Sequence, residues 1–408
     1  MKRLIGWLLV LAAGAGAGQK TELALPHRFT LAPAVDMAFP CPVSLAVPGS
    51  LPGEGATLWE QGDEDWFPVP SQPDPAQPER LWWLASRAGG TYELRAGKTA
   101  CPATATATPG DEELILAFGE KPVLAYHHAL LPPPAGANPR FTRGGFIHPL
   151  YSPGGEVLTA IHPKDHVHHF GLWNPWTSTE FAGREVDFWN LGKGQGTVRF
   201  ARFEAVFSGP VFAGFRAVHE HVALDLPEGE RVILEEVQDV RVWNTGDARF
   251  LIDFTSHQRC VADQPLTLKA YRYGGLVFRG RAGWHTDNSG YLTSEGKTRA
   301  DGHGTRARWS HAYGDTPLGG AGVLFMSHPE NRAHPEPLRL WPNDANRGRD
   351  NVFLNFCPVQ GEPWILEPGA VHTLRYRLCV YDGKPADIPA EAYWQAFARP
   401  PAGAVPGR

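Results

Sequence analysis

Alternation of apolar and polar residues is the main pattern in the second half of the chain. It is clearest over residues 197–207, 215–226 and 231–243. A period of two residues is typical of a β-strand with one buried face, because successive side chains point to opposite sides of the strand. Shorter apolar runs predict further strands at 114–118, 123–127, 250–254 and 266–268. Only residues 389–397 have a helical pattern.

The order of these patterns predicts two β-domains. Short runs at 43–47, 81–84 and 91–94 belong to the first, and the last two flank a turn at Gly89-Gly90. Small residues without periodicity at 103–110 predict a linker. Because no helices separate the strands, antiparallel sheets are favoured over a parallel α/β fold. The predicted fold is all-β, with a small N-terminal β-sandwich over 19–110 and a large antiparallel β-sandwich, or supersandwich, over 111–408.

The start of the chain resembles a secretory signal peptide. Lys2 and Arg3 precede a short apolar run at 4–13, and small residues at 15–17 offer a cleavage site. We expect residues 1–18 to be removed and the mature chain to begin near Gln19, in the periplasm or outside the cell. An uncleaved anchor is the alternative. No later stretch has about 20 uninterrupted apolar residues, so no stable membrane insertion is expected after cleavage.

Composition changes this picture in two ways. A net charge of −5 over 408 residues, without a basic run, gives no support to nucleic-acid binding. Export would permit disulfides among the five cysteines. Cys41 with Cys101 would brace the first domain, and Cys357 with Cys379 could link late strands, but the sequence alone does not determine the pairing.

The most unusual stretch is Asp165-His166-Val167-His168-His169-Phe170-Gly171-Leu172-Trp173. Pro163 and Gly171 place it on a loop or a strand end. Histidine exchanges protons near neutral pH, so His166, His168 and His169 are candidate catalytic residues, with Asp165 as the group that orients them. A surface or core role is the alternative. A divalent metal ion, if one is bound, would be held by these histidines and by His328, although no short metal motif is present.

Further candidates for substrate binding lie on both sides of this stretch. Arg143 could clamp a carboxylate through two hydrogen bonds or form a structural salt bridge, and His148 lies just after it. Trp173 could wall an apolar pocket. Asp187 and Trp189 suit a sugar pocket, where hydroxyls are hydrogen-bonded and rings stack, but they equally suit a strand end.

Two later segments complete the set of candidates. His328 and Asn331 follow the apolar run at 322–326, where polar groups are well placed for a site or for a turn. Glu236 falls on the otherwise apolar face of the predicted strand 231–243, and an inward carboxylate needs a partner or a wet cavity. A bulge or an edge position is the alternative for this residue. His219 and His221 share one strand face and are expected to be solvated.

Several of these segments together resemble a bacterial secreted family labelled "methane oxygenase PmoA-like", or a domain of unknown function. They are residues 143–155, 165–173, 187–189, 328–331 and 374–378. The resemblance covers roughly residues 113–384. The family commonly has Asp-His-Pro-His-His-Arg-Gly where this chain has Val167 and Phe170 in place of the proline and the arginine. The label names a membrane copper enzyme, whereas no membrane helix is expected here.

The resemblance implies a fold of the galactose-mutarotase type, in which histidine and carboxylate bind sugars on a concave sheet. Residues 67–72, 81–84 and 89–94 resemble the N-terminal β-domain of some exo-acting rhamnogalacturonan lyases. Our first hypothesis is therefore an exported carbohydrate-active enzyme, a lyase, hydrolase or epimerase acting on a sugar or an oxidised sugar. A non-catalytic glycan-binding protein and a metal-dependent oxygenase are the alternatives.

Overall fold

The computed structural model describes residues 23–31, 39–47, 49, 55–87, 89–97, 101–102, 104–246, 249–401 and 403–404. The expected signal peptide at 1–18 and the expected start at Gln19 lie outside these residues. Within them, no helix is both long enough and apolar enough to span a membrane. Strands account for most of the regular structure, and the prediction of an all-β fold is confirmed.

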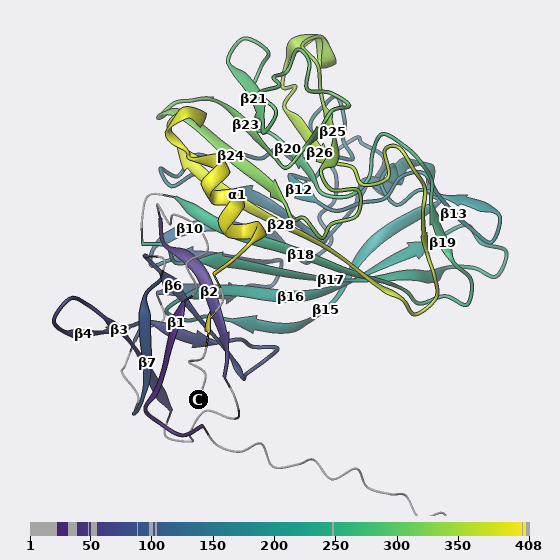
Figure 1. The fold of residues 1–408 in the computed structure, drawn as a ribbon. Coiled ribbons are helices and arrows are strands. Elements are labelled where there is room, and N and C mark those ends of the chain that lie inside the picture. The colour runs from purple at the N-terminus through teal and green to yellow at the C-terminus, as the bar shows by residue number, and fades with distance from the viewer. Residues whose placement is uncertain are drawn as a thin grey trace, which may run out of the picture.

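A small β-sandwich is formed mainly by the N-terminal part of the chain (Figure 1). One sheet contains, in order, β29 (Gly403–Ala404), β1 (His27–Leu31), β7 (Thr91–Ala96), β3 (Ala56–Gln61) and β4 (Trp66–Val69). The other contains β2 (Cys41–Ala46), β6 (Arg80–Ala85) and β5 (Ser71–Pro73). Phe29 and Leu94 of the first sheet share a buried core with Val43 and Trp83 of the second.

The structure corrects the expectation that a turn at Gly89-Gly90 joins two neighbouring strands. The strands β6 and β7 form as predicted, but β6 pairs with β2 and β5, whereas β7 pairs with β1 and β3. The connection therefore crosses from one sheet of the sandwich to the other. The Leu-Trp-Trp-Leu run of β6 contributes side chains to the cores of both sandwiches. Trp83 faces the small sandwich, and Trp82 packs against Trp243 of the large one, with ring centroids 5.2 Å apart.

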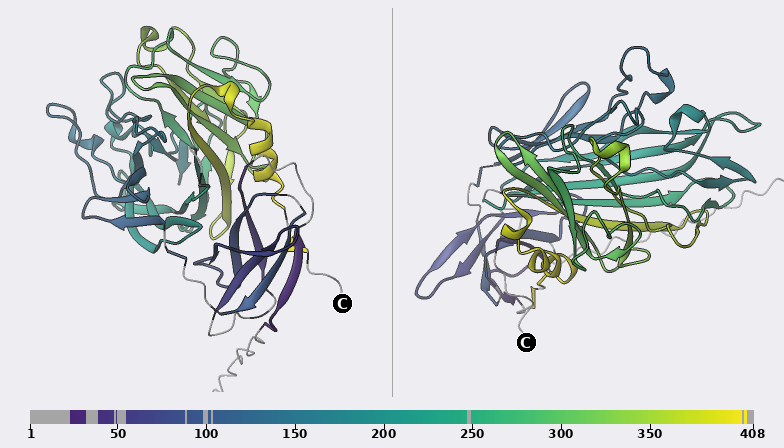
Figure 2. Two further views of the ribbon diagram at one scale, coloured as in Figure 1. Left: turned by 90° about the vertical axis from the view of Figure 1, so that its left-hand side faces the viewer. Right: turned by 90° about the horizontal axis from the view of Figure 1, so that it is seen from above.

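The large β-sandwich consists of two long antiparallel sheets (Figures 1 and 2). The first sheet contains, in order, β22 (Arg306–Ala307), β25 (Glu336–Leu340), β26 (Phe353–Phe356), β20 (Val277–Arg279), β12 (Leu172–Trp173), β11 (Phe146–Leu150), β10 (Lys121–His127), β9 (Glu113–Phe118) and β8 (Ala105–Pro109). The second contains β15 (Gly196–Phe207), β16 (Phe212–Ala223), β17 (Arg231–Trp243), β18 (Phe250–Cys260), β28 (Val371–Asp382), β24 (Gly319–Ser327), β23 (Trp309–Thr316) and β21 (Ser289–Thr293).

Smaller elements complete the fold. A four-stranded sheet contains β14 (Arg184–Val186), β13 (Thr179–Phe181), β19 (Leu266–Leu268) and β27 (Trp364–Leu366), so the predicted strand at 266–268 forms but belongs to this sheet. The helical elements are η1 (Pro139–Phe141), η2 (Leu191–Lys193), η3 (Ala345–Gly348), η4 (Pro385–Asp387) and α1 (Ala390–Ala398). The last is the helix that the sequence predicts at 389–397.

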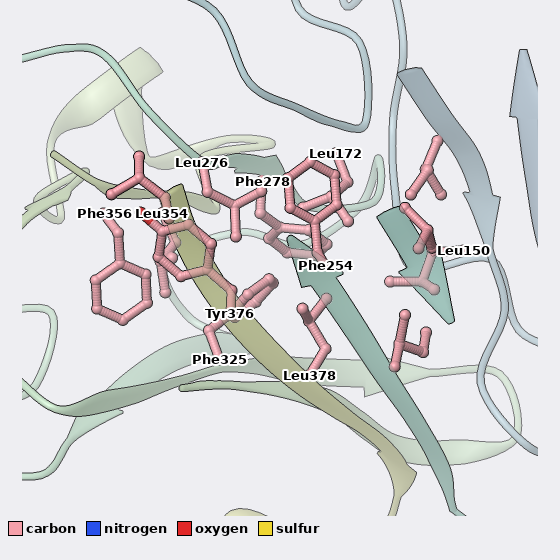
Figure 3. Packing of buried hydrophobic residues seen from close by; sticks show 14 of the residues in the cluster. Leu150, Leu172, Phe254, Leu276, Phe278, Phe325, Leu354, Phe356, Tyr376 and Leu378 are labelled. Carbon is pink, nitrogen blue, oxygen red and sulfur yellow. The ribbon is translucent and has the colours of Figure 1, made fainter. Parts of the chain in front are cut away.

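The core of the large sandwich lies between its two long sheets (Figure 3). Leu172 and Phe278 point into it from the first sheet, and Phe254, Phe325 and Leu378 point into it from the second. Alternation along the strands produces this packing, because every second side chain is removed from water on the inner face.

The two sandwiches are joined by specific polar contacts and by a second apolar cluster. Gln72 Oε1 accepts hydrogen bonds from the backbone N–H groups of Val211 and Phe212, both at 3.1 Å. Arg241 of β17 forms an ion pair with Asp74 at 2.8 Å. Helix α1 packs beside this joint (Figures 1 and 2). The contacts involve buried side chains, which favours one fixed arrangement of the two sandwiches.

Both predicted ends of the large domain need correction. Residues 105–109 were expected to be a linker, but they form β8, the edge strand of the first long sheet, paired with β9. At the other end, β29 pairs with β1 and so returns to the small sandwich. Small residues without periodicity are compatible with an edge strand, because only one side of such a strand is paired.

The cysteine pairings considered for an exported chain do not form. No disulfide joins any of the five cysteines, all of which lie in described residues. Cys41 is buried in the apolar cluster beside α1, and burial raises the pKa of its thiol to about 11. Cys357 lies in the core of the large sandwich, where its thiol donates to the Tyr271 carbonyl at 3.2 Å.

Candidate functional site

The histidine-rich stretch lies on the loop between β11 and β12, as the proline and glycine positions predict. A bridge between Ile161 and Phe170 closes the base of the loop. The His162 N–H donates to the His169 carbonyl at 2.9 Å, and two tight turns are closed by the N–H groups of His166 and His169, each at 3.0 Å. The backbone therefore holds the three histidines in a compact, hydrogen-bonded loop.

Gly171 is required where this loop rejoins the sheet. Its φ is +65°, in the left-handed region, and a Cβ at this position would lie 2.4 Å from the Ile147 carbonyl oxygen. Any other residue would combine an unfavourable backbone conformation with a clash against the neighbouring strand.

The three histidines line a pocket of about 240 Å³. Its lining comes from separate parts of the chain and consists of His166, His168, His169, Thr177, Trp189, Asn190, Tyr271, Arg272, Tyr273 and Trp341. Aromatic rings and hydrogen-bonding groups thus meet in one concave place, which is the usual composition of a small-molecule site. Of the candidates predicted from the sequence, the pocket brings together the three histidines and Trp189.

Asp165 lies directly behind the pocket and orients His166. Its Oδ2 is 2.8 Å from Nδ1 of His166, and both of its oxygens are 2.9 Å from Nη2 of Arg279. Partial burial acts to raise the pKa of Asp165, but the hydrogen bond from His166 and the Arg279 guanidinium lower it to about 2. The carboxylate is therefore ionised at neutral pH, so that His166 donates from Nδ1. Nε2 of His166 has no hydrogen-bond partner among the described residues.

His168 and His169 are neutral at physiological pH. Burial, with the nearby His166, lowers the pKa of His168 to about 4. Burial and the neighbouring Arg279 lower the pKa of His169 well below its usual value. Nη1 of Arg279 is 3.3 Å from Nδ1 of His169. Because arginine can only donate, Nδ1 of His169 must be the acceptor, and its proton resides on Nε2.

The histidine cluster does not fit a metal ion. Within the part of the chain that the structure describes, no three His, Cys, Asp or Glu side chains are placed so that they could share one. Nδ1 of His169 accepts from Arg279, so its Nε2 carries the proton and has no lone pair for a metal ion. We therefore derive no chemistry through a metal, including the redox metal that an oxygenase would need.

An aromatic layer separates the pocket from the interior of the sandwich. Phe170, Trp173 and Phe353 belong to one buried cluster, and the Trp173 ring centroid is 5.3 Å from that of His169. Trp173 is 1% exposed, so it supports His169 from behind and does not line the pocket. The prediction that Trp173 forms a wall of the pocket is therefore wrong.

Glu236 lies beneath this layer, in a fully buried polar network. Its Oε1 accepts from Asn174 and Ser256, both at 2.6 Å, and its Oε2 is 3.2 Å from Nε2 of His221. Burial acts to raise the pKa of Glu236, but His219 and His221 lower it below its usual value. The alternation on β17 thus predicts the inward position of Glu236 correctly, and the partner that an inward carboxylate requires is present.

The expectation that His219 and His221 are solvated is wrong. Both are buried, with exposures of 1% and 0%. His219 also forms a hydrogen bond with the Tyr126 hydroxyl. The strand face that carries these histidines is the inner face of β16, where they face Glu236 of β17. Two polar residues on one strand face led to the expectation that this face is exposed to solvent. The face is buried instead, and Glu236 on the neighbouring strand is the partner of both histidines.

Three other candidates lie near the pocket without lining it. Arg143 is 1% exposed, its Nη1 donates to the Phe188 carbonyl at 3.4 Å, and burial lowers its pKa to about 10. Asp187 accepts from the Trp189 and Asn190 N–H groups at 3.0 and 2.8 Å, directly after β14, which agrees with the strand end considered for it. Nδ1 of His148 is 2.8 Å from the Thr159 hydroxyl, and burial lowers the pKa of this histidine to about 4.

His328 and Asn331 do not join the histidine pocket, and the prediction of a shared site is wrong for them. The His328 ring packs on Phe397 of α1, with centroids 5.1 Å apart. Asn331 donates to Glu336 at 2.9 Å and accepts from the Arg375 N–H at 2.7 Å. These residues form the turn after β24 and fasten it to β25 and β28.

Several residues that line or support the pocket were missed from the sequence. Arg279 lies on β20, and Trp341 directly follows β25. Neither residue is part of a recognisable sequence motif. The run Tyr271-Arg272-Tyr273, directly before Gly274-Gly275, is the one visible signal, since aromatic and basic residues at a glycine turn suit a binding surface.

The sequence model of a family described only as a family of unknown function, DUF6807, matches residues 113–395. The chain belongs to this family. The matched region begins at β9 and ends in α1, so it contains the histidine loop and the whole pocket. The part of the sequence resemblance that indicates a domain of unknown function is thereby confirmed, while the oxygenase label is not shown by this match. No curated protein matches the chain.

Two solved structures resemble the chain at low sequence identity. One is the heparan sulfate lyase HepC from Pedobacter heparinus, with 10% identity, a TM-score of 0.31, and coverage of 71% of this chain and 38% of that one. The other is a galactose mutarotase related enzyme from Lactobacillus acidophilus, with 8% identity, a TM-score of 0.25, and coverage of 69% and 98%. Nothing about the activity of this chain follows from similarities at these values.

Replacement of Glu236 by alanine is expected to unfold the large sandwich more easily. Removal of one partner from a buried ionic network leaves the others unpaired and typically costs about 3–5 kcal/mol. Glu235 is the matched control, because it lies next along β17 and makes a surface ion pair with Arg259 at 3.0 Å. Glu235→Ala should change the free energy of unfolding by less than about 1 kcal/mol. Equal denaturation midpoints for the two variants would contradict the structural role of Glu236.

The low pKa of His168 predicts a loss of stability in mild acid. In the unfolded chain His168 has its usual pKa of about 6.5 and takes up a proton near that pH. In the folded chain it stays neutral down to about pH 4. The unfolded chain therefore binds more protons in this window, and the free energy of unfolding falls as the pH drops through it.

Urea denaturation between pH 7.5 and pH 4 measures this slope. His168→Gln should show a shallower loss than the wild type, with the remainder due to groups such as His148. An unchanged slope in the variant would show that folding does not lower the pKa of His168.

Proposed function

We propose that the chain is an exported carbohydrate-active enzyme that transfers a proton to or from a sugar, as a lyase or an epimerase does. The observation that carries this proposal is the pair of Asp165 and His166, joined at 2.8 Å, at the edge of an aromatic pocket. The charged start of the chain, with its short apolar run, supports export.

His166 is the group best placed to act as acid and base. Asp165 accepts a hydrogen bond from Nδ1–H of His166 and fixes the tautomer, which leaves Nε2 able to accept a proton from a substrate and to return it. Arg279 holds Asp165 from the other side, so that the carboxylate cannot rotate away from the ring. A histidine oriented by a carboxylate is a recurrent arrangement for proton transfer.

The remaining lining suits a sugar ring. Trp189, Tyr273 and Trp341 provide aromatic surface, on which the C–H face of a sugar can stack. Thr177, Asn190 and Arg272 provide groups that can hydrogen-bond to hydroxyls. The neutral imidazole of His168 can likewise donate or accept a hydrogen bond.

Hydrolysis, which the sequence analysis also considered, is less well supported than the action of a lyase or an epimerase. Most glycosidases use two carboxyl groups on opposite sides of the scissile bond. The described residues that line the pocket include no Asp or Glu, and Asp165 is committed to His166 and Arg279. One carboxylate behind a histidine favours proton transfer over the two-carboxylate mechanism.

The test is turnover of the purified protein on a panel of glycosides, uronides and keto-sugars. His166→Ala should reduce kcat by roughly 10²–10⁴-fold, the usual contribution of a proton-transfer group, without lowering the melting temperature appreciably. His328→Ala is the control, since it removes a histidine that packs on α1, away from the pocket.

The outcomes separate the two functional hypotheses. Sugar binding without turnover of any member of the panel would indicate a glycan-binding protein. A His166→Ala variant with wild-type kcat would remove the proposed catalytic role. Loss of turnover in His328→Ala at an unchanged melting temperature would place the reacting groups elsewhere.

A further inference from the structure

A second, larger cavity lies on the other side of the pair formed by Asp165 and Arg279. Its volume is about 940 Å³, within the usual range of about 300–1,000 Å³ for small-molecule sites. Both members of the pair line this cavity, which we call the arginine cleft, whereas their partners His166 and His169 line the histidine pocket. The two cavities are therefore separated by a wall of hydrogen-bonded side chains.

The arginine cleft carries an excess of positive charge. Lys164, Arg347 and Arg349 line it and are exposed, and within the described part of the chain none of their side chains has an ion pair or a hydrogen bond. Like charges gathered in a concave place repel one another, and an anion bound there relieves the repulsion.

The carboxylates of the cleft compensate these cations only in part. Asp165 is bound to Arg279 and His166. Asp350 Oδ1 accepts from the Gly283 N–H at 2.5 Å and is 3.8 Å from Nδ1 of His285. Arg279 is itself neutralised by Asp165, so Lys164, Arg347 and Arg349 face only the single carboxylate of Asp350, and the lining keeps a net positive charge.

Unfavourable backbone conformations gather at the same place. Among the described residues other than glycine, six have a positive φ, and four of these line the arginine cleft: His162 at 46°, Asn346 at 48°, Arg347 at 56° and Asp350 at 43°. Asparagine, aspartate and histidine tolerate this region better than other residues do, but arginine does not. Such conformations persist where the surroundings impose them, and they concentrate at ligand-binding sites.

We propose that the arginine cleft is a binding subsite for an oxyanion, the carboxylate or sulfate group of an acidic sugar. Arg347 and Arg349 would each offer two parallel N–H donors to the two oxygens of such a group, and Lys164 would add a point charge. The identification of the ligand as a sugar rests on the proposed function. Binding of an oxyanion in the cleft does not.

The test is calorimetric titration of the full mature chain with three trisaccharides: trigalacturonate, a sulfated galactotriose and neutral galactotriose. We expect at least one acidic trisaccharide to bind at least tenfold more tightly than the neutral one. Substitution of both arginines, Arg347→Gln with Arg349→Gln, should weaken that binding roughly 10- to 100-fold, as expected for lost hydrogen bonds to a charged group. The preference between carboxylate and sulfate identifies the oxyanion.

Two controls isolate the cleft. Glutamine keeps an unbranched side chain at the left-handed position 347, and an unchanged melting temperature would show that the doubly substituted protein is folded. Arg184→Gln removes an exposed arginine from β14, outside the cleft, and should leave binding unchanged. A rise from 50 to 300 mM salt should weaken binding to the wild type more than binding to the doubly substituted variant.

The subsite and the catalytic proposal can fail independently. His166→Ala should lose turnover and keep the affinity for the acidic trisaccharide. If the acidic trisaccharides bind no more tightly than the neutral one, or if none binds, the subsite is wrong. It is also wrong if the doubly substituted variant keeps wild-type affinity. Cleft-dependent binding without turnover would preserve the subsite and contradict the enzyme.

Discussion

The histidine site depends on one buried cation. Arg279 is 0% exposed, and its guanidinium contacts three segments that are distant in the sequence. It binds both oxygens of Asp165, donates to the Asp350 carbonyl at 2.7 Å and lies over the Trp341 ring at 4.7 Å from its centroid. A buried guanidinium is costly unless its charge is compensated and its donors are used. The need to satisfy Arg279 therefore brings the histidine loop, the segment before β26 and the end of β25 together around the pocket.

The polar network around Glu236 has a different task, although it too consists of histidines and a carboxylate. It connects β16, β17 and β18 of the second long sheet with Asn174, which follows β12 of the first. Histidines and a carboxylate together on the inner face of a sheet would by their residue types alone be taken for a binding site. In this chain, the residues that occupy the inner sheet face are enclosed, and the accessible histidines come from a loop above them. The site has to be identified by exposure and geometry, since residue types alone would select either group.

Local patterns predicted much of the fold, because alternation reflects burial on one face of a strand. The bounds of β17 and β19 agree with the apolar and polar pattern, and the loop position of the histidines follows from Pro163 and Gly171. Pairing partners are not encoded locally in this way. The connection between β6 and β7 crosses the small sandwich, and the polar face of β16 proved to be internal, because each depends on a strand that is distant in the sequence. The prediction for His328 was wrong for the same reason. The ring of His328 packs on α1, which comes from the C-terminal end of the chain.

Arg279 illustrates the limit most clearly. A single arginine in an apolar strand has no sequence signature, and its importance arises only from Asp165, 114 positions away. The same contact also explains why the pocket and the arginine cleft occur together. Asp165 presents one oxygen to His166 on the pocket side, and the cation that fixes it lines the cleft. A shift of the histidine loop would therefore alter both cavities at once.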